Sequence, residues 1–225
     1  MATIGVIPAA GFATRLQPIQ TSKEVYPLDG RPVMDYLLER LAAASPDEIR
    51  VVTRPDKLDV AENARRWGAT VVWGHPASLA ESFATGIGDA APDDVILMGF
   101  PDTIWEPVDG FVRARALLDQ GYDVGLALFR PREADLPRYE TVVADESGRV
   151  RGIDVKPEVP SSRWIWGAAA ARARALTGLR GQTQPGHLFD SLCDSGLVGS
   201  VQVSDTFVDM GTHEGLDQAR QITED

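Results

Sequence analysis

Short apolar runs alternate with amphipathic stretches along the first 130 residues of the chain. The apolar runs are rich in Val and Ile and predict strands, and the stretches between them, with apolar residues three or four positions apart, predict helices. Strands connected through helices are typical of a parallel α/β sheet. The predicted strands are Thr3–Ile7, Glu48–Thr53, Thr70–Trp73, Val95–Gly99 and Asp123–Phe129, and the predicted helices are Val33–Ala43, Leu58–Trp67, Leu79–Ile87 and Gly110–Gln120.

Two of the predicted strands are continuous apolar runs without a polar face. They are "DVILMGF", residues 94–100, and "DVGLALF", residues 123–129. Strands of this kind are buried on both faces, as in a parallel sheet that helices cover on two sides. Ligands of such sheets bind beyond the carboxyl ends of the strands, so we expect a functional site in the loops that follow them.

The pattern changes after Arg130. The segment "RYETVVADESGRVRGIDV" has two strand-like runs around Asp-Glu-Ser-Gly, which predicts an antiparallel hairpin. "SSRWIWGAAA" predicts a further strand that leads into an Ala/Arg-rich helix around Ala169–Leu176. A helix near His187–Ser195, a strand at Val198–Val203 and a last helix from about Glu214 complete the chain. The predicted fold class is therefore α/β, with a parallel half followed by a mixed half.

Composition and charge narrow the class of protein. A chain of 225 residues that is 44% hydrophobic can fold as one domain, with roughly 70% of its unfolded surface buried. Its formal charge of −11 argues against a nucleic-acid surface, because phosphate backbones bind clustered Lys and Arg. Cys193, the only cysteine, cannot pair within the chain, and no segment approaches the ~18 apolar residues of a membrane span. We expect a cytoplasmic protein without membrane or nucleic-acid partners.

The start of the chain carries a local excess of positive charge. Arg15, Lys23 and Arg31 lie close together in the sequence, and only Glu24 and Asp29 are acidic before Arg31. On so acidic a chain, a basic island of this kind suits a small polyanion.

The island begins in "AAGFATRLQP", residues 9–18, directly after the first predicted strand. Gly11, Ala13 and Thr14 offer backbone N–H groups and a hydroxyl that can bind phosphate oxygens. Arg15 adds a planar, permanently charged fork. The loop lacks the Gly-Lys-Ser/Thr ending of a P-loop and the dinucleotide pattern Gly-x-Gly-x-x-Gly, so an ordinary turn at the strand exit is the alternative.

Four other charged residues lie in long loops or follow predicted strands. Lys23 lies on a connection of about 20 residues stiffened by prolines, and connections this long are usually functional in compact domains. Asp102 and Asp209 each follow a strand-like run, and together they would supply the carboxylates that Mg²⁺ prefers beside phosphate oxygens. Lys156 ends another such run. The plain alternatives are solvated lysines and turn-capping aspartates.

Six landmarks follow one another over nearly the whole chain: "AAGFATRLQP", "SKEVYPLDGRPVMDYLLERL", "LAESF", "GFPDTIW", "VKPEVPSSRWIWGAA" and "VDMGTHEGLDQA". Their order and separation resemble those of the sugar-1-phosphate nucleotidyltransferases, the family that contains glucose-1-phosphate thymidylyltransferase. The resemblance implies a three-layer Rossmann-like (GT-A-like) fold with a mixed, mostly parallel central sheet and an antiparallel extension on the sugar side. It also implies a single domain, residues 1–225, in which residues 1–130 mainly bind the nucleotide and residues 131–225 mainly bind the sugar phosphate.

The same resemblance implies roles for individual residues. Arg15 would stabilise the leaving pyrophosphate, and Lys23 would neutralise the α-phosphoryl group. Asp102 and Asp209 match the metal-binding aspartates, with Mg²⁺ as the cofactor. The residues implied in nucleotide binding are Ala9, Ala10, Gly11, Ala13, Thr14 and Ser78, and those implied in sugar-phosphate binding are Glu140, Lys156 and Trp166.

The implied activity is transfer of a nucleotidyl group from a nucleoside triphosphate to a sugar 1-phosphate or phosphorylated polyol, by a monomer or small homo-oligomer. Two departures from the family pattern motivate a second hypothesis, a catalytically silent sensor of nucleotide sugars. Ala13 replaces the second glycine of the loop, and Glu140 stands where relatives commonly have glycine. A glycosyltransferase is a third and less favoured hypothesis, because no Asp-x-Asp motif follows the central strand.

Overall fold

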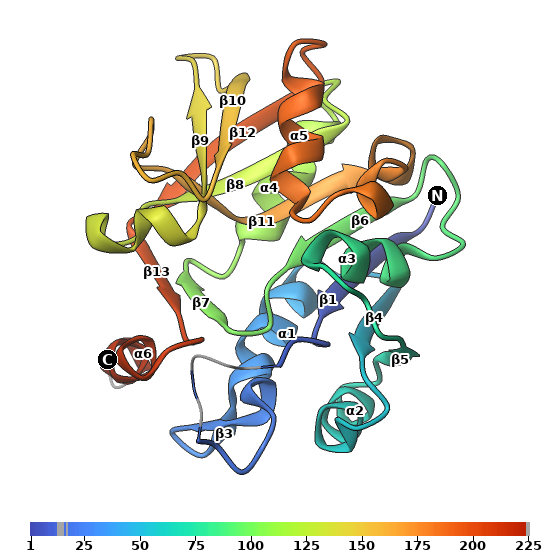
Figure 1. Ribbon diagram of the computed structural model, residues 1–225. Helices are drawn as coiled ribbons and strands as arrows, with labels where there is room; N and C mark the ends of the chain where they lie inside the picture. The colour runs from blue at the N-terminus through green and yellow to red at the C-terminus, as the bar shows by residue number, and fades with distance from the viewer. Residues whose placement is uncertain (13–15, 17, 224–225) are drawn as a thin grey trace.

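A mixed sheet runs through the centre of the computed structural model, which describes residues 1–12, 16 and 18–223 (Figure 1). Its strands are β1 (Thr3–Pro8), β4 (Glu48–Thr53), β5 (Thr70–Trp73), β6 (Val95–Gly99), β8 (Val124–Phe129), β9 (Glu140–Ala144), β10 (Val150–Val155), β11 (Ile165–Arg172) and β12 (Val198–Ser204). The bounds of β4, β5 and β6 are those predicted from the apolar runs, and β1, β8 and β12 differ from their predictions at one end by one residue.

Parallel pairs form the half of the sheet that comes first in the chain. β1 pairs in parallel with β4 and β6, and β4 pairs in parallel with β5. β11 runs antiparallel between β6 and β8, and β12 lies parallel to β8. The antiparallel hairpin β9–β10 joins the sheet where Thr141 pairs with Ile165. The predicted α/β class, with a mostly parallel sheet and an antiparallel extension, is confirmed.

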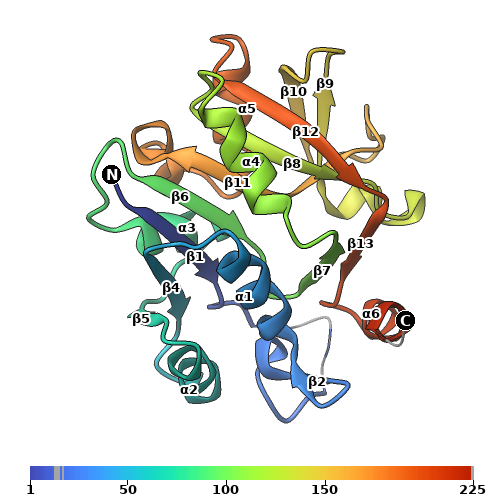
Figure 2. The same cartoon turned by 180° about the vertical axis from the view of Figure 1, so that it is seen from behind.

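Helices cover both faces of the sheet and complete a three-layer arrangement. They are α1 (Val33–Ala43), α2 (Leu58–Arg66), α3 (Leu79–Ile87), α4 (Gly110–Leu118), α5 (Pro185–Cys193) and α6 (His213–Thr223). Side chains of α1, α2 and α4 pack with Ile7 and Leu97 on one face, and those of α3 and α5 pack with Val6 and Ile96 on the other. Figures 1 and 2 show these two faces from opposite sides. Among the helices of the described ranges, none combines the length and the apolar character that crossing a bilayer requires.

The run of alanines at residues 168–171 lies in β11, so the helix predicted around Ala169–Leu176 is wrong. All four alanines are fully buried, and alternate ones belong to the apolar cores on opposite faces of the sheet. Their backbone pairs with β6 on one side and with β8 on the other. This pairing outweighs the helix propensity of alanine, which amounts to less than about 1 kcal/mol per residue. A 3₁₀ turn, η4 (Ala173–Leu176), follows the strand.

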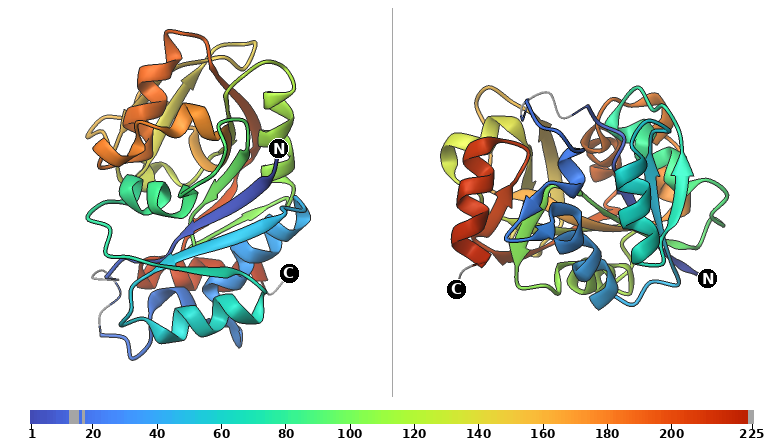
Figure 3. Two further views of the ribbon diagram at one scale, coloured as in Figure 1. Left: turned by 90° about the vertical axis from the view of Figure 1, so that its right-hand side faces the viewer. Right: turned by 90° about the horizontal axis from the view of Figure 1, so that it is seen from below.

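Two short antiparallel ladders lie outside the main sheet and were absent from the predicted elements. β2 (Pro27–Leu28) pairs with β3 (Arg31–Pro32), and β7 (Thr103–Glu106) pairs with β13 (Thr206–Asp209). Leu216 of α6 packs into an apolar cluster formed by both ladders, and Figure 3 shows α6 beside β13. Among the residues that the structure describes, further 3₁₀ turns are η2 (Lys23–Val25), η3 (Glu133–Arg138) and η5 (Leu179–Gly181).

Gly125 of β8 faces α4 at a point where no side chain fits. A Cβ atom added there would lie 2.1 Å from the carbonyl oxygen of Ala114. We expect Gly125→Ala to displace α4 and to lower the free energy of unfolding by about 1–3 kcal/mol, measured by urea denaturation. Gly181→Ala is the matched control, because a Cβ at Gly181 meets no atom within 4 Å. Equal stability of the two variants would contradict this packing.

Candidate active site

A cleft of about 670 Å³ opens beyond the carboxyl ends of β1 and β6. It collects residues that lie far apart in the sequence. The predicted site residues in its wall are Ala10, Gly11, Lys23, Ser78, Asp102, Glu140, Lys156, Trp166 and Asp209. The predicted residues Ala13, Thr14 and Arg15 lie outside the described residues. The cleft therefore contains five of the six charged residues that were assigned to the site from the sequence, and the sixth, Arg15, lies outside the described residues.

The ladder between β7 and β13 brings together the two segments that carry Asp102 and Asp209, and both residues line the cleft. Asp102 directly precedes β7, and Asp209 pairs with Thr103 at the end of β13. The Met210 N–H donates a 2.7 Å hydrogen bond to the carbonyl oxygen of Asp102, which fixes the two segments next to each other. The Gly211 N–H donates to Oδ1 of Asp209 at 2.7 Å. Their adjacency follows from a short ladder that joins segments about 100 positions apart.

Arg40 of α1 holds the far end of β7 in place. Its guanidinium is almost fully buried and donates from Nε to the carbonyl oxygen of Trp105 at 2.7 Å and from Nη2 to Glu106 at 2.7 Å. A third bond runs from Nη1 to the carbonyl oxygen of Tyr36 at 2.8 Å. The strand that follows Asp102 is thus anchored to the helix layer as well as to β13.

Lys23 reaches Asp102 from the turn η2. Its Nζ lies 2.5 Å from Oδ2 of Asp102, and both side chains are largely buried. Burial by itself would lower the pKa of Lys23, but the carboxylates of Asp102 and Glu24 outweigh it and raise the pKa above its ordinary value. Lys23 is therefore a fixed cation beside the two aspartates.

The carboxylate pair fits a divalent cation that is held jointly with phosphate. The part of the chain that the structure describes contains no group of three or more His, Cys, Asp and Glu side chains able to hold a metal ion. Mg²⁺ is usually bound by one or two carboxylates together with phosphate oxygens and water. Asp102 and Asp209 match that donor set, and the ammonium group of Lys23 shows that this position favours a cation.

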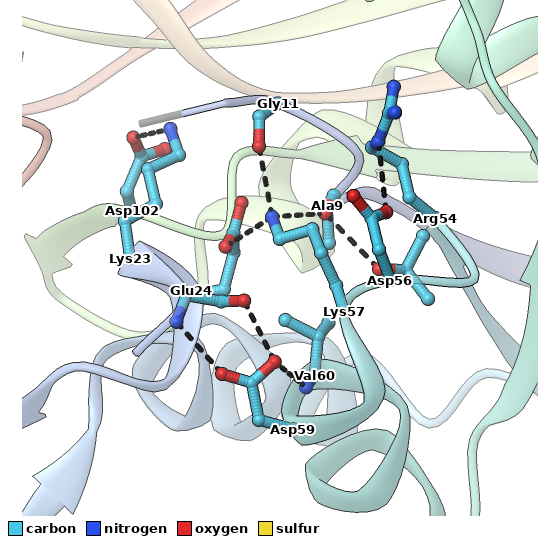
Figure 4. A network of polar contacts seen from close by, with 12 residues as sticks. Ala9, Gly11, Lys23, Glu24, Arg54, Asp56, Lys57, Asp59, Val60 and Asp102 are labelled. Atoms are coloured by element: carbon cyan, nitrogen blue, oxygen red, sulfur yellow. Dashed lines mark hydrogen bonds and ion pairs between the residues drawn. The ribbon is translucent and has the colours of Figure 1, made fainter. Parts of the chain in front are cut away.

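The glycine-bearing loop after β1 is supported from below by Lys57, as Figure 4 shows. Nζ of Lys57 donates to the carbonyl oxygens of Ala9 and Gly11 at 2.8 and 3.0 Å. Ala9 itself is fully buried, and its N–H donates to the carbonyl oxygen of Val52, so it lies beneath the cleft and outside its wall. Ala10, Gly11 and Phe12 form the wall at this point.

Ser78 is the N-cap residue of α3 and lines the cleft. Its hydroxyl accepts from the Glu81 N–H as the helix N-cap and donates to the carbonyl oxygen of Gln182 at 2.9 Å. One turn later Ser82 also lines the cleft, and its buried hydroxyl has no hydrogen-bond partner among the described residues. Sequence reasoning missed Ser82, although it lies on the same helix face as Ser78.

Glu140 and Trp166 meet in the half of the cleft formed by β9 and β11. Nε1 of Trp166 donates to Oε2 of Glu140 at 2.6 Å, and the Gly186 N–H also donates to this carboxyl group. Oε1 is buried and has no partner among the described groups. Burial raises the pKa of Glu140 above its ordinary value, although both donors and the charge of Lys156 oppose that shift.

Lys156 ends the β9–β10 hairpin in a backbone conformation that is unusual for lysine. Its φ is +50°, in the left-handed region where side chains other than those of Gly, Asn and Asp are uncommon. Its N–H donates to the carbonyl oxygen of Tyr139 at 3.0 Å, which holds the turn. Strained residues of this kind cluster at ligand sites, and here the strain places an exposed lysine at the rim of the cleft.

Aromatic side chains that the sequence did not single out form much of the remaining wall. Phe100 packs on Trp166 with ring centroids 4.9 Å apart, and Tyr139 meets Phe207 at 5.7 Å. Phe100 could have been suspected from its place just before Asp102, whereas the other contacts depend on tertiary packing.

The predicted basic island is only partly present. Arg31 does not line the cleft, because its guanidinium pairs with Glu39 at 2.9 Å and stacks on the ring of Tyr36. Lys57, which the sequence did not single out, lies beside Lys23 at the loop instead. Tertiary structure therefore decides which basic side chains lie at the loop, and closeness in the sequence does not predict them.

Known nucleotidyltransferases are similar to this chain over most of its length. The model of the MobA-like NTP transferase domain matches residues 5–147. A glucose-1-phosphate thymidylyltransferase of Neisseria meningitidis is 27% identical, in an alignment that covers 98% of this chain and 82% of that protein.

Solved structures share the fold over the full length of the chain. A UDP-glucose pyrophosphorylase complexed with UDP-glucose gives a TM-score of 0.84 at 17% identity and covers 100% of this chain and 99% of that one. The inositol-1-phosphate CTP transferase of T. maritima gives a TM-score of 0.82 at 15% identity, covering 100% and 95%. At these identities the likeness establishes the fold.

The buried carboxyl group of Glu140 predicts a pH-dependent stability. Its pKa is raised in the folded state, so between the ordinary value of 4.5 and the raised value the unfolded chain releases this proton first. The free energy of unfolding of the wild type should therefore fall relative to Glu140→Gln as the pH rises through that window. The expected slope is about 1.4 kcal/mol for each pH unit inside the window. Urea denaturation at a series of pH values measures this.

A matched control is Glu146→Gln, because Glu146 lies exposed at the turn of the same hairpin. The difference in the free energy of unfolding between Glu146→Gln and the wild type should not change with pH in the way expected for Glu140→Gln. A constant difference between wild type and Glu140→Gln at every pH would show that burial does not disfavour the charged form.

Proposed function

The chain belongs to the MobA-like NTP transferase family, and from that premise we propose that it transfers a nucleotidyl group from a nucleoside triphosphate to a sugar 1-phosphate or related phosphorylated polyol. The observation that carries the proposal is the convergence of Lys23, Asp102, Lys156 and Asp209 in one cleft. Two anions must meet in this reaction, and the cleft supplies cations and metal-binding carboxylates where they would meet. The relatives named above support the acceptor class, since their names specify glucose 1-phosphate and inositol 1-phosphate.

The reaction needs no nucleophile from the protein, because a phosphate oxygen of the acceptor attacks the α-phosphorus directly. A new bond forms between that oxygen and the α-phosphorus while the bond from the α-phosphorus to the bridging oxygen of the β-phosphate breaks. The electron pair leaves with the pyrophosphate. Catalysis of such a step rests on positioning and charge stabilisation. Lys23 is placed to stabilise the α-phosphoryl group, and Arg15 is our candidate for the leaving pyrophosphate.

Asp102 and Asp209 are the residues that would hold a divalent cation, and we propose Mg²⁺ as that cation. When bound, it would neutralise phosphate charge and orient the triphosphate. Lys23 pairs with Asp102 at 2.5 Å, and we therefore assign both residues to the same phosphate.

The two halves of the chain would divide the substrates between them. Residues 1–130 contribute the glycine-bearing loop, Ser78 and Asp102, and we assign them mainly to the nucleotide. Residues 131–225 contribute Lys156 for the acceptor phosphate, with Glu140 and Trp166 facing the rest of the acceptor. A carboxyl group with one unpaired oxygen suits a hydroxyl of a sugar or polyol.

A silent sensor of the same fold is less consistent with this arrangement. A sensor has no need for an aligned lysine and two aspartates at the nucleotide side of the pocket. The presence of this lysine and both aspartates in one cleft therefore favours an enzyme over a sensor.

We expect pyrophosphate release when the protein is supplied with Mg²⁺, one of the five common nucleoside triphosphates and a suitable acceptor. The test is a matrix of ATP, CTP, GTP, UTP and dTTP against sugar 1-phosphates and inositol 1-phosphate. EDTA should abolish the signal, and Mg²⁺ should restore it. Silence across the matrix, with triphosphate binding intact, would favour the sensor.

Replacing Asp102 by Asn should lower turnover by at least about 10²-fold, because the amide cannot balance the charge of a metal ion and a lysine. The variant retains the shape of the side chain, so its circular dichroism should stay that of the folded wild type, whereas its unfolding midpoint should fall because Lys23 loses the opposite charge beside it. Asp119→Asn is the control, since Asp119 lies exposed at the end of α4. Turnover of the Asp102 variant at the wild-type rate would remove this residue from the mechanism.

A further inference from the structure

The chain uses lysine at very few positions. Of its 22 Lys and Arg residues only three are lysines: Lys23, Lys57 and Lys156. Lys23 and Lys156 line the cleft, and Lys57 lies under the glycine-bearing loop. All the other basic residues are arginines, including those that form ion pairs on the surface. The ammonium groups of Lys23 and Lys57 each form an ion pair at the cleft or beneath it, and Lys57 is the lysine to which the proposed reaction assigns no role.

Lys57 makes three hydrogen bonds from a single nitrogen atom. Nζ donates to the carbonyl oxygens of Ala9 and Gly11 at 2.8 and 3.0 Å and to Oε2 of Glu24 at 2.7 Å (Figure 4). The Lys57 side chain is 11% exposed and that of Glu24 is fully buried. An ammonium group has three N–H donors, so all of them are directed at fixed acceptors.

Arginine does not reproduce this arrangement. Its donors lie in one plane and in a rigid fork, whereas the three acceptors around Nζ come from two residues of one loop and from a neighbouring segment. The position thus requires a point charge with donors in several directions.

The two carbonyl bonds also determine where the loop presents its N–H groups. In a trans peptide the C=O of one residue and the N–H of the next point in opposite directions. With the oxygens of Ala9 and Gly11 turned down to Lys57, the N–H groups of Ala10 and Phe12 are turned the other way. Both residues belong to the wall of the cleft.

A second set of contacts ties this support to the turn that carries Lys23. Glu24 is the next residue after Lys23, and Asp59 at the start of α2 accepts from both the N–H and the hydroxyl of Ser22 at 2.8 Å. The segment from Lys57 to Asp59 therefore holds the glycine-bearing loop and the η2 turn in one fixed relation.

We propose that Lys57 is a positioning residue for the nucleoside triphosphate: with Glu24 it aims the N–H groups of Ala10 and Phe12 at the phosphates and keeps Lys23 in register with them. This inference rests on the proposed function and concerns the triphosphate half of the cleft. Loss of Lys57 should weaken triphosphate binding and leave acceptor binding unchanged.

The test compares Lys57→Met, Lys57→Arg and the double variant Lys57→Met with Glu24→Met. The double variant removes both members of the buried pair, so no uncompensated charge is left to destabilise the fold. For each protein, calorimetry measures the Kd of the Mg²⁺ complex of whichever of ATP, CTP, GTP, UTP or dTTP the wild type binds most tightly. Thermal unfolding and the KM for the acceptor are measured alongside, with Arg66→Met as the control on the exposed face of α2.

We expect the double variant and Lys57→Arg to unfold near the wild-type midpoint but to bind the triphosphate at least about tenfold more weakly. The KM for the acceptor and the Kd of Arg66→Met should stay within about twofold of wild type. Wild-type affinity in the double variant, or in Lys57→Arg, would overturn the positioning role while leaving the proposed function standing. A wild-type chain that binds none of the five triphosphates would overturn both.

Discussion

The ion pair between Lys23 and Asp102 joins the two segments on which the cleft depends. Lys23 comes from the long connection after β1, and Asp102 comes from the short connection between β6 and β7, 79 residues later. The β7–β13 ladder adds Asp209 to the same place. The negative charges of Asp102 and Asp209 both act on Lys23 and help to raise its pKa, so the ammonium group offsets the repulsion between these like charges. The same electrostatic demand makes the place suitable for a metal ion and phosphates.

Much of the scaffold could be predicted because it is determined by local pattern. Short runs rich in Val and Ile predicted β4, β5 and β6 with correct bounds, and an amphipathic repeat predicted α1. The alanines of β11 were assigned to a helix because alanine favours a helix in isolation, and only the two neighbouring strands make an extended conformation preferable. The β7–β13 ladder pairs strands about 100 residues apart, and no local signal specifies such a pairing.

The site divides in the same way. Lys23, Asp102 and Lys156 could be predicted because each belongs to a landmark or follows a strand, and parallel strands end at a common edge. Arg31 and Lys57 could not be ranked correctly from the sequence, because both are basic residues near the first loop. Their tertiary partners separate them: Arg31 pairs with Glu39 on α1, whereas Lys57 reaches the loop carbonyls. The chain has only three lysines, and this scarcity could have drawn attention to Lys57, whereas its position in the sequence could not.

One side of the cleft is built from backbone groups and the other from side chains. This difference explains why the phosphate chemistry is easier to infer than the acceptor. On the side that we assign to the nucleotide, the loop at Ala10 and Gly11 offers backbone groups held by a buried ion pair, and such groups bind phosphate whatever base is attached. On the other side, Glu140 and Trp166 present side chains from β9 and β11, whose identity can change without altering the sheet. In the proposed function these side chains meet the acceptor, so a substitution at Glu140 is expected to affect the acceptor more than the phosphate chemistry. The scaffold therefore constrains the reaction more tightly than it constrains the acceptor.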